Sequence, residues 1–503
     1  MIAPARNGVA RTDHPEERRR VDWPGPGTKV PIHALLGALL AYGVSCGPRR
    51  ATIAPPVRPP SQFSASGTSE VSDQWWRSLG DTTLDALVER ALENNLTLRV
   101  AWDRLRQAEA IARREGASAF SSLSASASVA ATETHTGGSA GGDETTMGYS
   151  LELAASYELD LWGRLQASRD AAALDAQATG EDVRTAAVTL SAEVATTWYR
   201  LAQQDGQIEL LQRQLTANEE MLDLVMLRFR QGQTRAEDVL QQRQVVESRR
   251  GSIALAQASA AVLRHQLAIL LGQVPTANVV EAPTRLVQLP PLPATGVPAE
   301  LIQRRPDTRR AYCDVQAADR RVAAAVAERF PRVSIAAGAS TSAQNARNLF
   351  DDWLASLAGN LAMPLIDGGR RRAEVERTRA VVSASLHVYG QVVLNALTEV
   401  EDALSREQRQ AEYIASLERQ LALAEGVIER SRDNYMKGMV DYLSVLNAEQ
   451  THQALERTHL DARAIQIETR IALYRALSGG WAMTRPGETV TQRRTADTAL
   501  TEE

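Results

Sequence analysis

The sequence contains little cysteine, histidine or aromatic residue. Among its 503 residues are two cysteines, Cys46 and Cys313, seven histidines and only 5% aromatics. Two cysteines cannot form a disulfide framework, and their spacing is not that of a metal site. The histidines are scattered, and no P-loop, HExxH or GxSxG motif is present. We therefore expect no enzymatic activity, and no cofactor or metal site.

The sequence has no excess of positive charge. It also has no unbroken apolar run long enough for a membrane helix. The net charge of -5 gives no reason to expect a nucleic-acid partner. No stretch reaches 18 consecutive apolar residues, which argues against a spanning helix. The composition is instead dominated by Ala, Arg, Gln, Leu and Glu, which is typical of long helices.

The one apolar run near the N-terminus covers residues 32–44. It follows basic residues and ends in Ser45-Cys46-Gly47, so residues 1–45 are predicted to be a signal peptide. The cysteine directly after the run resembles that of a bacterial lipobox, and Cys46 is then the expected site of lipidation. A plain secretory signal with an incidental cysteine is the alternative. The basic segment before the run is long, which suggests that translation starts downstream of Met1.

Proline divides the rest of the chain. Residues 46–73 are rich in Pro, Ser and Ala and are predicted to be an extended tether. No proline occurs in residues 61–274 or 365–485, and proline is depleted from helix interiors because it lacks the amide hydrogen and clashes with the preceding turn. Six prolines fall in residues 275–298, a predicted linker between two halves. Residues 482–503 form a predicted disordered tail.

The two halves repeat each other at an offset of 206 residues. Arg230-Gln231-Gly232 corresponds to Met436-Lys437-Gly438, and Trp162-Gly163-Arg164 corresponds to Gly368-Gly369-Arg370. Apolar residues at helical spacing follow the same offset. This pattern predicts an internal duplication, with repeats at residues 74–274 and 299–481.

Each half is predicted to contain a long helical hairpin. The helices are expected over residues 164–230 and 233–271, and again over 370–437 and 439–477. Gly232 and Gly438 lie at the turns, where glycine suits the left-handed conformation that ends a helix. A helix of this length extends roughly 100 Å.

Alternating apolar and polar residues precede each long helix. Strands are predicted over residues 121–131 and 147–161 in the first half, and over 332–343 and 353–366 in the second. Polar loops at residues 132–146 and 344–352 join each pair. Alternation with a period of two places one set of side chains on each face of a sheet.

Such a sheet could cover a helical bundle in a soluble domain. However, its second face carries Ser, Gly and Glu, and the strands are long enough to cross a bilayer at a tilt. Strands span lipid only inside a closed barrel. Four strands cannot close one, whereas three copies would supply twelve. The predicted fold is thus an α+β membrane protein, with two strands and a helical hairpin in each repeat.

Five specific motifs occur along the chain. They are Trp75-Trp76, Tyr157-Glu158-Leu159-Asp160-Leu161-Trp162-Gly163-Arg164, Arg304-Arg305-Pro306-Asp307, Pro364-Leu365-Ile366-Asp367-Gly368-Gly369 and Gly479-Gly480-Trp481. With these motifs the chain resembles the TolC-like outer-membrane factors, in particular the lipid-anchored NodT/OprM branch. The resemblance covers about residues 74–481.

The resemblance implies a homotrimer with a 12-stranded outer-membrane barrel on an α-helical periplasmic tunnel. It also implies contact with outer-membrane lipid, a periplasmic adaptor and an inner-membrane pump of the RND type. The expected function is passive conduction of drugs or other toxic small molecules to the exterior. A type I protein-secretion channel and a periplasmic coiled-coil adaptor are the alternatives, and the predicted strands argue against the adaptor.

In that family, acidic residues near the hairpin turns surround a periplasmic aperture. The corresponding positions are Asp238, Asp441, Ser444 and Asn447. Ser444 and Asn447 stand where the family commonly has carboxylates, which weakens the expectation of a cation-selective gate. The alternative for the two aspartates is a carboxylate that stabilises a helix start.

The family resemblance also implies that the tips contact the adaptor. The candidate docking residues are Arg230, Gly232, Lys437 and Gly438. For the two glycines, turn geometry alone is the alternative explanation.

Overall fold

The computed structural model describes residues 56–69, 72–135, 137, 143–275, 286–481, 483 and 485. These residues belong to one compact unit, Pro55–Glu503. The expected signal peptide, Cys46 and most of the expected tail lie outside the described residues.

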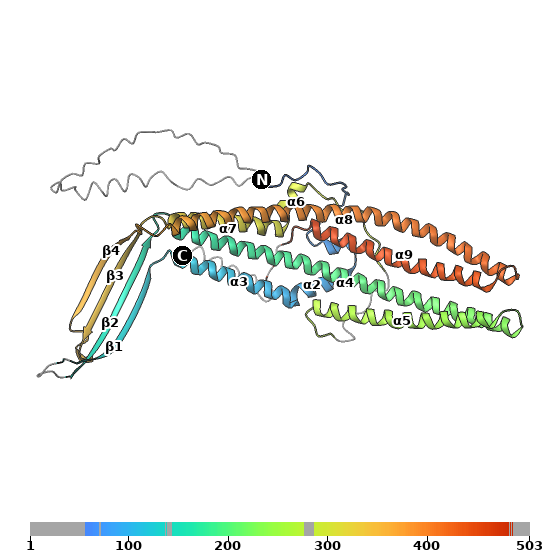
Figure 1. The fold of residues 1–503 in the computed structure, drawn as a ribbon, viewed down its shortest axis with the longest axis horizontal. Helices are drawn as coiled ribbons and strands as arrows, with labels where there is room; N and C mark the ends of the chain where they lie inside the picture. Colours follow the sequence, from blue (N-terminus) through green and yellow to red (C-terminus); the bar gives the residue numbers. More distant parts are fainter. Residues whose placement is uncertain are drawn as a thin grey trace, which may run out of the picture. The chain divides into compact units, whose positions relative to one another are not determined.

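The two halves contain the same series of elements (Figure 1). Each has short helices, then two strands, then a long helix and a return helix. In the first half these are α2 (Thr82–Asn94), α3 (Leu96–Ala117), β1 (Ser122–His135), β2 (Asp143–Leu159), α4 (Arg164–Arg230) and α5 (Ala236–Leu270). In the second half they are α6 (Pro298–Arg304), α7 (Pro306–Ala327), β3 (Arg332–Ala343), β4 (Trp353–Ala362), α8 (Arg370–Met436) and α9 (Tyr442–Leu477). Two short 3-10 helices, η1 (Trp75–Leu79) and η2 (Ala346–Asn348), complete the series.

The long helices α4 and α8 each contain 67 residues. Each is followed by a tight turn in which Gly232 (φ 70°) or Gly438 (φ 71°) adopts the left-handed conformation, as expected for glycine at the end of a helix. The return helices begin at Ala236 and Tyr442, a few residues later than expected. The sheet lies at one end of the long helices and the turns at the other (Figure 1).

The four shorter helices were not predicted from the alternation or the proline pattern. Their start signals are nevertheless local. The carboxylate of Asp81 accepts hydrogen bonds from the N–H groups of Thr83 and Leu84, both at 3.0 Å, at the start of α2, and Pro306 opens α7. These are standard N-terminal residues of helices. Helices α3 and α7 pack against α4, and α7 also packs against α8.

The sheet is antiparallel throughout, with strand order β1-β2-β3-β4. Four predicted strand limits were wrong: the end of β1, both ends of β2 and the end of β4. The ladder of β1 and β2 continues through Thr132↔Thr146 to His135↔Asp143, into the expected loop. Strand β4 ends at Ala362, because Pro364 has no N–H with which to continue a ladder.

Aromatic side chains from the two ends of the unit form the centre of the core. Trp75 stacks on Tyr474 with ring centroids 5.6 Å apart, and Trp76 meets Trp481 edge-on at 5.0 Å. The indole N–H of Trp198 donates to Asp81 at 2.8 Å. The paired tryptophans therefore join the start of the first repeat to the end of the second.

Two of the helices are apolar over a membrane-spanning length, although no run of 18 apolar residues is unbroken. Helices α5 and α8 each contain an 18-residue window that is long and apolar enough to cross a membrane by length and composition. Only 22% and 17% of these windows are buried. Exposed apolar residues such as Leu255 and Val262 on α5, and Val388 on α8, instead leave surface that another chain could cover.

Candidate channel sheet and hairpin tips

The register of the sheet separates its side chains into an apolar and a polar face. Residues that pair directly across two strands point to the same face of the sheet. Pairs such as Ala125↔Leu153 and Val333↔Leu361 therefore define the apolar face. The apolar face carries Leu123, Val129, Met147, Tyr149, Leu151, Leu153, Tyr157, Leu159, Val333, Ile335, Trp353, Leu357 and Leu361. The polar face carries Ser122, Ser124, Ser126, Ser128, Ser150, Glu152, Ser156, Glu158, Ser334, Ser340 and Asn360.

Within the described residues, no helix packs extensively on the sheet, and β1 and β4 are exposed along their whole length. In this part of the chain β1 pairs only with β2, and β4 only with β3, so one edge of each has unpaired backbone groups. In water, a sheet with an exposed apolar face and two open edges would tend to aggregate. This sheet is suited to lipid on one face and water on the other, with other strands at its edges.

Aromatic residues mark the junction between sheet and helices. Trp162 and Phe330 stack with centroids 4.8 Å apart, and the indole N–H of Trp162 donates to the carbonyl of Pro331 at 2.7 Å. Both rings stay partly exposed. Aromatic residues of this kind are enriched where a barrel meets the membrane–water interface.

At the first hairpin tip, Asp238 supports the start of α5. It is the third residue of that helix, and its carboxylate accepts hydrogen bonds from the Arg235 N–H at 3.1 Å and from the Thr234 hydroxyl. At the second tip, Asp441 lies directly before α9 and accepts from the Ser444 N–H at 3.0 Å and hydroxyl at 2.6 Å. These Ser444 bonds lower the pKa of Asp441.

Each aspartate therefore caps the start of its return helix, but the two aspartates occupy different positions in the cap. The offset of 206 pairs Asp441 with Arg235 and Ser444 with Asp238, so the carboxylate is the third helical residue in one half and the cap in the other. This geometry agrees with the helix-start explanation. Ser444 and Asn447 are exposed on the first turns of α9.

The candidate docking residues are all exposed at the tips. Arg230 ends α4, and Lys437 forms an ion pair with Asp433 one turn earlier. A side chain added at Gly232 or Gly438 would meet nothing within 4 Å, so the turns are open to a partner. Their positive φ values alone also require glycine.

Sequence reasoning missed the contacts between the two tips. The Arg228 guanidinium lies 4.2 Å from the centre of the Tyr435 ring and donates to the Tyr435 carbonyl at 3.2 Å. The Tyr442 hydroxyl bonds with Gln242. Tyr435 and Phe229 occupy matching positions in the two repeats, and no local signal in the sequence identifies the pairing of Tyr435 with Arg228.

Buried amides continue this connection along the hairpins. The Gln242 side chain donates to the Asn218 carbonyl at 2.7 Å, and the Asn218 amide donates to Gln453 at 3.3 Å. Nearby, Glu449 is buried and pairs with Arg432 at 2.9 Å. Burial raises the pKa of Glu449, although Arg432 opposes that shift. Satisfied polar networks of this kind fix the register of packed helices.

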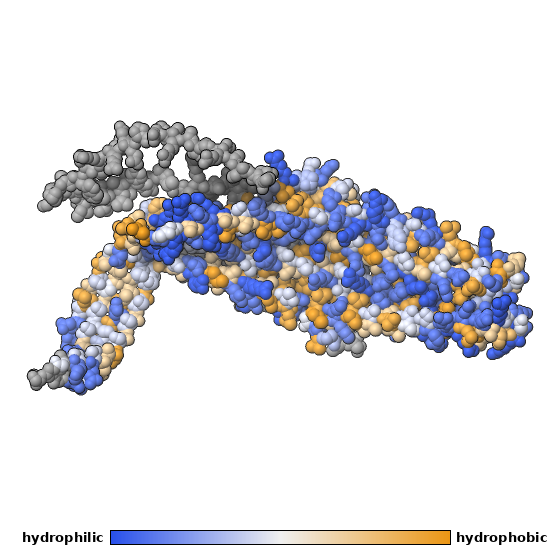
Figure 2. Space-filling view, in the orientation of Figure 1, coloured by the Kyte–Doolittle hydropathy of each residue, from blue (hydrophilic) through white to orange (hydrophobic). Residues whose placement is uncertain are grey.

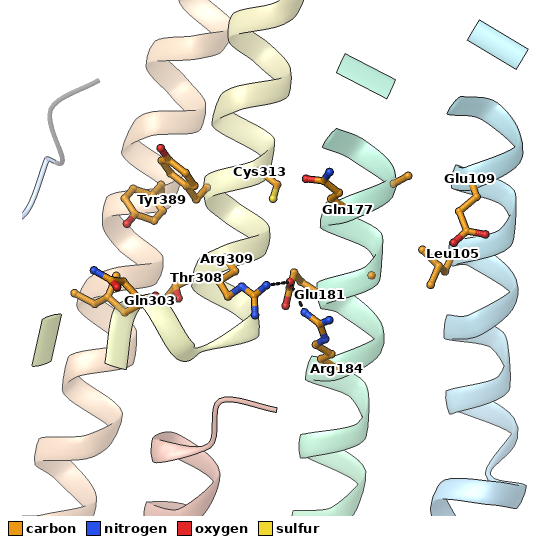
Figure 3. A pocket seen from close by; sticks show the side chains of 14 residues that line it. Leu105, Glu109, Gln177, Glu181, Arg184, Gln303, Thr308, Arg309, Cys313 and Tyr389 are labelled. Atoms are coloured by element: carbon orange, nitrogen blue, oxygen red, sulfur yellow. Dashed lines mark hydrogen bonds and ion pairs between the residues drawn. The ribbon is translucent and has the colours of Figure 1, made fainter. Parts of the chain in front are cut away.

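A cavity of about 690 Å³ lies where α3, α4, α7 and α8 meet (Figure 3). The buried Glu181 carboxylate accepts from Arg184 at 2.6 Å and pairs with Arg309 at 2.7 Å. This pairing joins α4 to α7, and thus one half to the other. Burial raises the pKa of the Cys313 thiol that lines the cavity, which disfavours the reactive thiolate. The described residues contain no cluster of three His, Cys, Asp or Glu that could hold a metal ion.

An open sheet with one apolar and one polar face, joined to long helical hairpins, defines a subunit of a membrane channel. The sequence model of the outer membrane efflux protein family matches residues 87–273 and 297–479, one segment in each half. The chain belongs to this family, and it is an outer-membrane efflux channel that extends into the periplasm. The family match excludes the periplasmic adaptor as an alternative.

Relatives support the same assignment over nearly the whole chain. The pyoverdine export outer membrane protein OpmQ of Pseudomonas aeruginosa is 31% identical over 90% of this chain and 98% of its own. The cation efflux system protein CusC of Escherichia coli K12 is 30% identical, over 88% and 98%. The structure of the outer-membrane channel OprN has a TM-score of 0.77, with 28% identity over 86% of this chain and all of its own.

Proposed function

We propose that three copies of the chain form a 12-stranded barrel and a periplasmic helical tunnel that together conduct small molecules or ions to the exterior. The observation that supports this most directly is the pair of open edges on a four-stranded sheet with lipid-type and water-type faces. Lipid does not tolerate unpaired backbone groups. Closure with two further copies pairs every edge and places the Ser and Glu face inside the pore.

The same assembly accounts for the exposed apolar surface of the helices. Residues such as Leu255, Val262 and Val388 would be covered by neighbouring copies. In the resulting tunnel, the tips narrow around Asp238, Asp441, Ser444 and Asn447, with Arg230, Gly232, Lys437 and Gly438 available to a periplasmic adaptor. The adaptor in turn connects the channel to an inner-membrane pump of the RND type.

The assembly is tested by fractionating cells that express the full chain. We expect the protein in the outer membrane as a trimer that survives mild detergent and dissociates to monomers on heating, because paired barrel edges are lost only on unfolding. Semi-native electrophoresis of heated and unheated samples measures this. Recovery of a soluble periplasmic monomer would contradict the proposal.

The N-terminal lipid is a separate proposal that rests on the lipobox-like sequence before Cys46. One acyl chain alone gives marginal membrane binding, so the lipid would add to an anchorage that the barrel already provides. We expect Cys46→Ala to abolish incorporation of a clickable palmitate analogue and to leave the trimer intact. Cys313→Ala is the matched control, and label retained in the Cys46 variant would exclude that site.

The transported compounds are proposed only by class. OpmQ is named for pyoverdine export and CusC for cation efflux, so small organic molecules and ions are the favoured cargo. A type I protein-secretion channel is the less favoured alternative, since neither name refers to protein export.

A further inference from the structure

The two repeats differ at the junction where each long helix leaves the sheet. In the first half, Arg164 begins α4 and makes three hydrogen bonds to Glu158, at 2.8, 2.9 and 3.3 Å. The next residue, Leu165, is buried. The guanidinium of Arg164 is therefore occupied by an ion pair within the chain.

The second half has three arginines at the corresponding place. Arg370, Arg371 and Arg372 begin α8, and Pro364 stands where the first half has Glu158. Among the described residues, neither Arg370 nor Arg371 has a carboxylate within ion-pair distance. In the described part of the chain, the one ion pair of Arg372 is with Glu376, at 3.2 Å, and both side chains are more than half exposed. We call Arg370, Arg371 and Arg372 the arginine cluster.

The nearest carboxylate before the cluster is already occupied. Asp367 accepts hydrogen bonds from the Gly369 N–H at 3.0 Å and the Arg371 N–H at 3.3 Å. It caps the helix backbone, and among the described residues no arginine side chain pairs with it. The cluster thus presents a local excess of positive charge.

The cluster lies next to the most exposed apolar residues of the junction. Leu365 and Ile366, between β4 and α8, are 85% and 94% exposed. Figure 2 shows a strongly hydrophilic patch over the sheet end of the helices, beside apolar residues at the end of the sheet. At a membrane interface, the acyl chains lie next to the layer of charged headgroups. Apolar side chains followed directly by arginines match this order.

We propose that the arginine cluster binds the headgroups of anionic phospholipids in the periplasmic leaflet of the outer membrane. Because the helices extend into the periplasm, this end of the sheet faces that leaflet. Guanidinium groups bind phosphate oxygens in a bidentate manner, and Leu365 and Ile366 insert beside the lipid tails. The inference rests on the barrel of the proposed function.

The test measures lipid retained by the purified, full-length protein. The protein in detergent is offered equal amounts of phosphatidylglycerol and phosphatidylethanolamine, and bound lipids are counted by native mass spectrometry. We expect the wild type to retain more phosphatidylglycerol. Replacing all three arginines with Gln should remove this preference, by roughly fivefold for each charge lost, while the Lys replacements should keep most of it.

A matched control removes the same charge from the same helix. Arg406, Arg409 and Arg419 are exposed on α8, more than about 50 Å from the cluster at 1.5 Å per residue. Their triple Gln variant should keep the lipid preference. Equal retention of both lipids by the wild type, or an unchanged preference in the cluster variant, would overturn the proposal.

Three outcomes for the trimer separate this inference from the other proposals. If the cluster variant loses its trimer while each monomer keeps its phosphatidylglycerol, the arginines pair with another copy of the chain and the lipid site is wrong. If the variant keeps a heat-sensitive trimer and loses only the lipid preference, the inference holds. A wild type that is not a trimer would instead contradict the proposed barrel.

Discussion

Leu153→Arg is expected to prevent assembly of the outer-membrane trimer. Leu153 lies on the apolar face in the middle of β2, directly paired with Ala125 and Ala339. An arginine on the lipid face near the bilayer midplane costs about 2–4 kcal/mol, and a trimer carries three of them. The variant should lose most of the heat-sensitive trimer band and appear in periplasmic aggregates or degradation products.

Ser126→Arg is the matched control, one position along the ladder on the other face. Ser126 pairs with Glu152, so the new arginine lies beside a carboxylate on the polar face. This variant should assemble at close to wild-type levels and change conductance or ion selectivity instead. Normal trimers from Leu153→Arg, or equal loss in both variants, would show that the apolar face does not contact lipid.

The regular parts of the fold could be predicted because their signals are periodic or local. The bounds of α4 and β3 match the expected ranges, since a glycine or a proline punctuates the chain near their ends. Because the chain is duplicated, each element expected in one half is also expected 206 residues away in the other. Turn positions Gly232 and Gly438 followed from the conformational freedom of glycine, which needs no knowledge of distant contacts.

The interactions between the halves could not be predicted, because they join residues far apart in the sequence. Arg228 and Tyr435 are 207 positions apart, and Gln242 and Tyr442 are 200. Neither hydropathy period nor motif spacing carries information on such pairs. The short helices α2, α3, α6 and α7 were not predicted, although local start signals such as Asp81 before α2 and Pro306 at the start of α7 are present in the sequence.

Comparison of the repeats is informative where they diverge. Asp238 and Asp441 occupy different positions in the repeat, yet each still caps the start of its return helix. The two repeats thus keep the same structural role with a carboxylate at a different position. The change from a paired Arg164 to three arginines at the start of α8 has no such internal compensation. A duplicated fold therefore offers its own control for separating residues that maintain a shared structure from residues that have gained a separate function.

Arg470→Ala is expected to cause the largest loss of stability within the helical region. Arg470 is buried on α9, and its Nε donates to both carboxylate oxygens of Glu407 at 2.8 and 2.9 Å. Its Nη1 donates to the carbonyls of Pro290 and Pro291 at 2.7 and 3.1 Å. One guanidinium thus joins α8, α9 and the linker between the repeats.

Removing that guanidinium leaves the Glu407 carboxylate buried without its partner, which typically lowers the free energy of unfolding by about 3–5 kcal/mol. We expect a clear drop in the melting temperature of the detergent-solubilised protein and faster proteolysis of the linker. The double variant Glu407→Leu with Arg470→Met should recover much of the loss, because neither charge then remains buried. Arg475→Ala, which removes an exposed arginine from the same helix, should change the melting temperature little. An effect of Arg470→Ala no larger than that of Arg475→Ala would mean that this contact does not hold the linker against the hairpins.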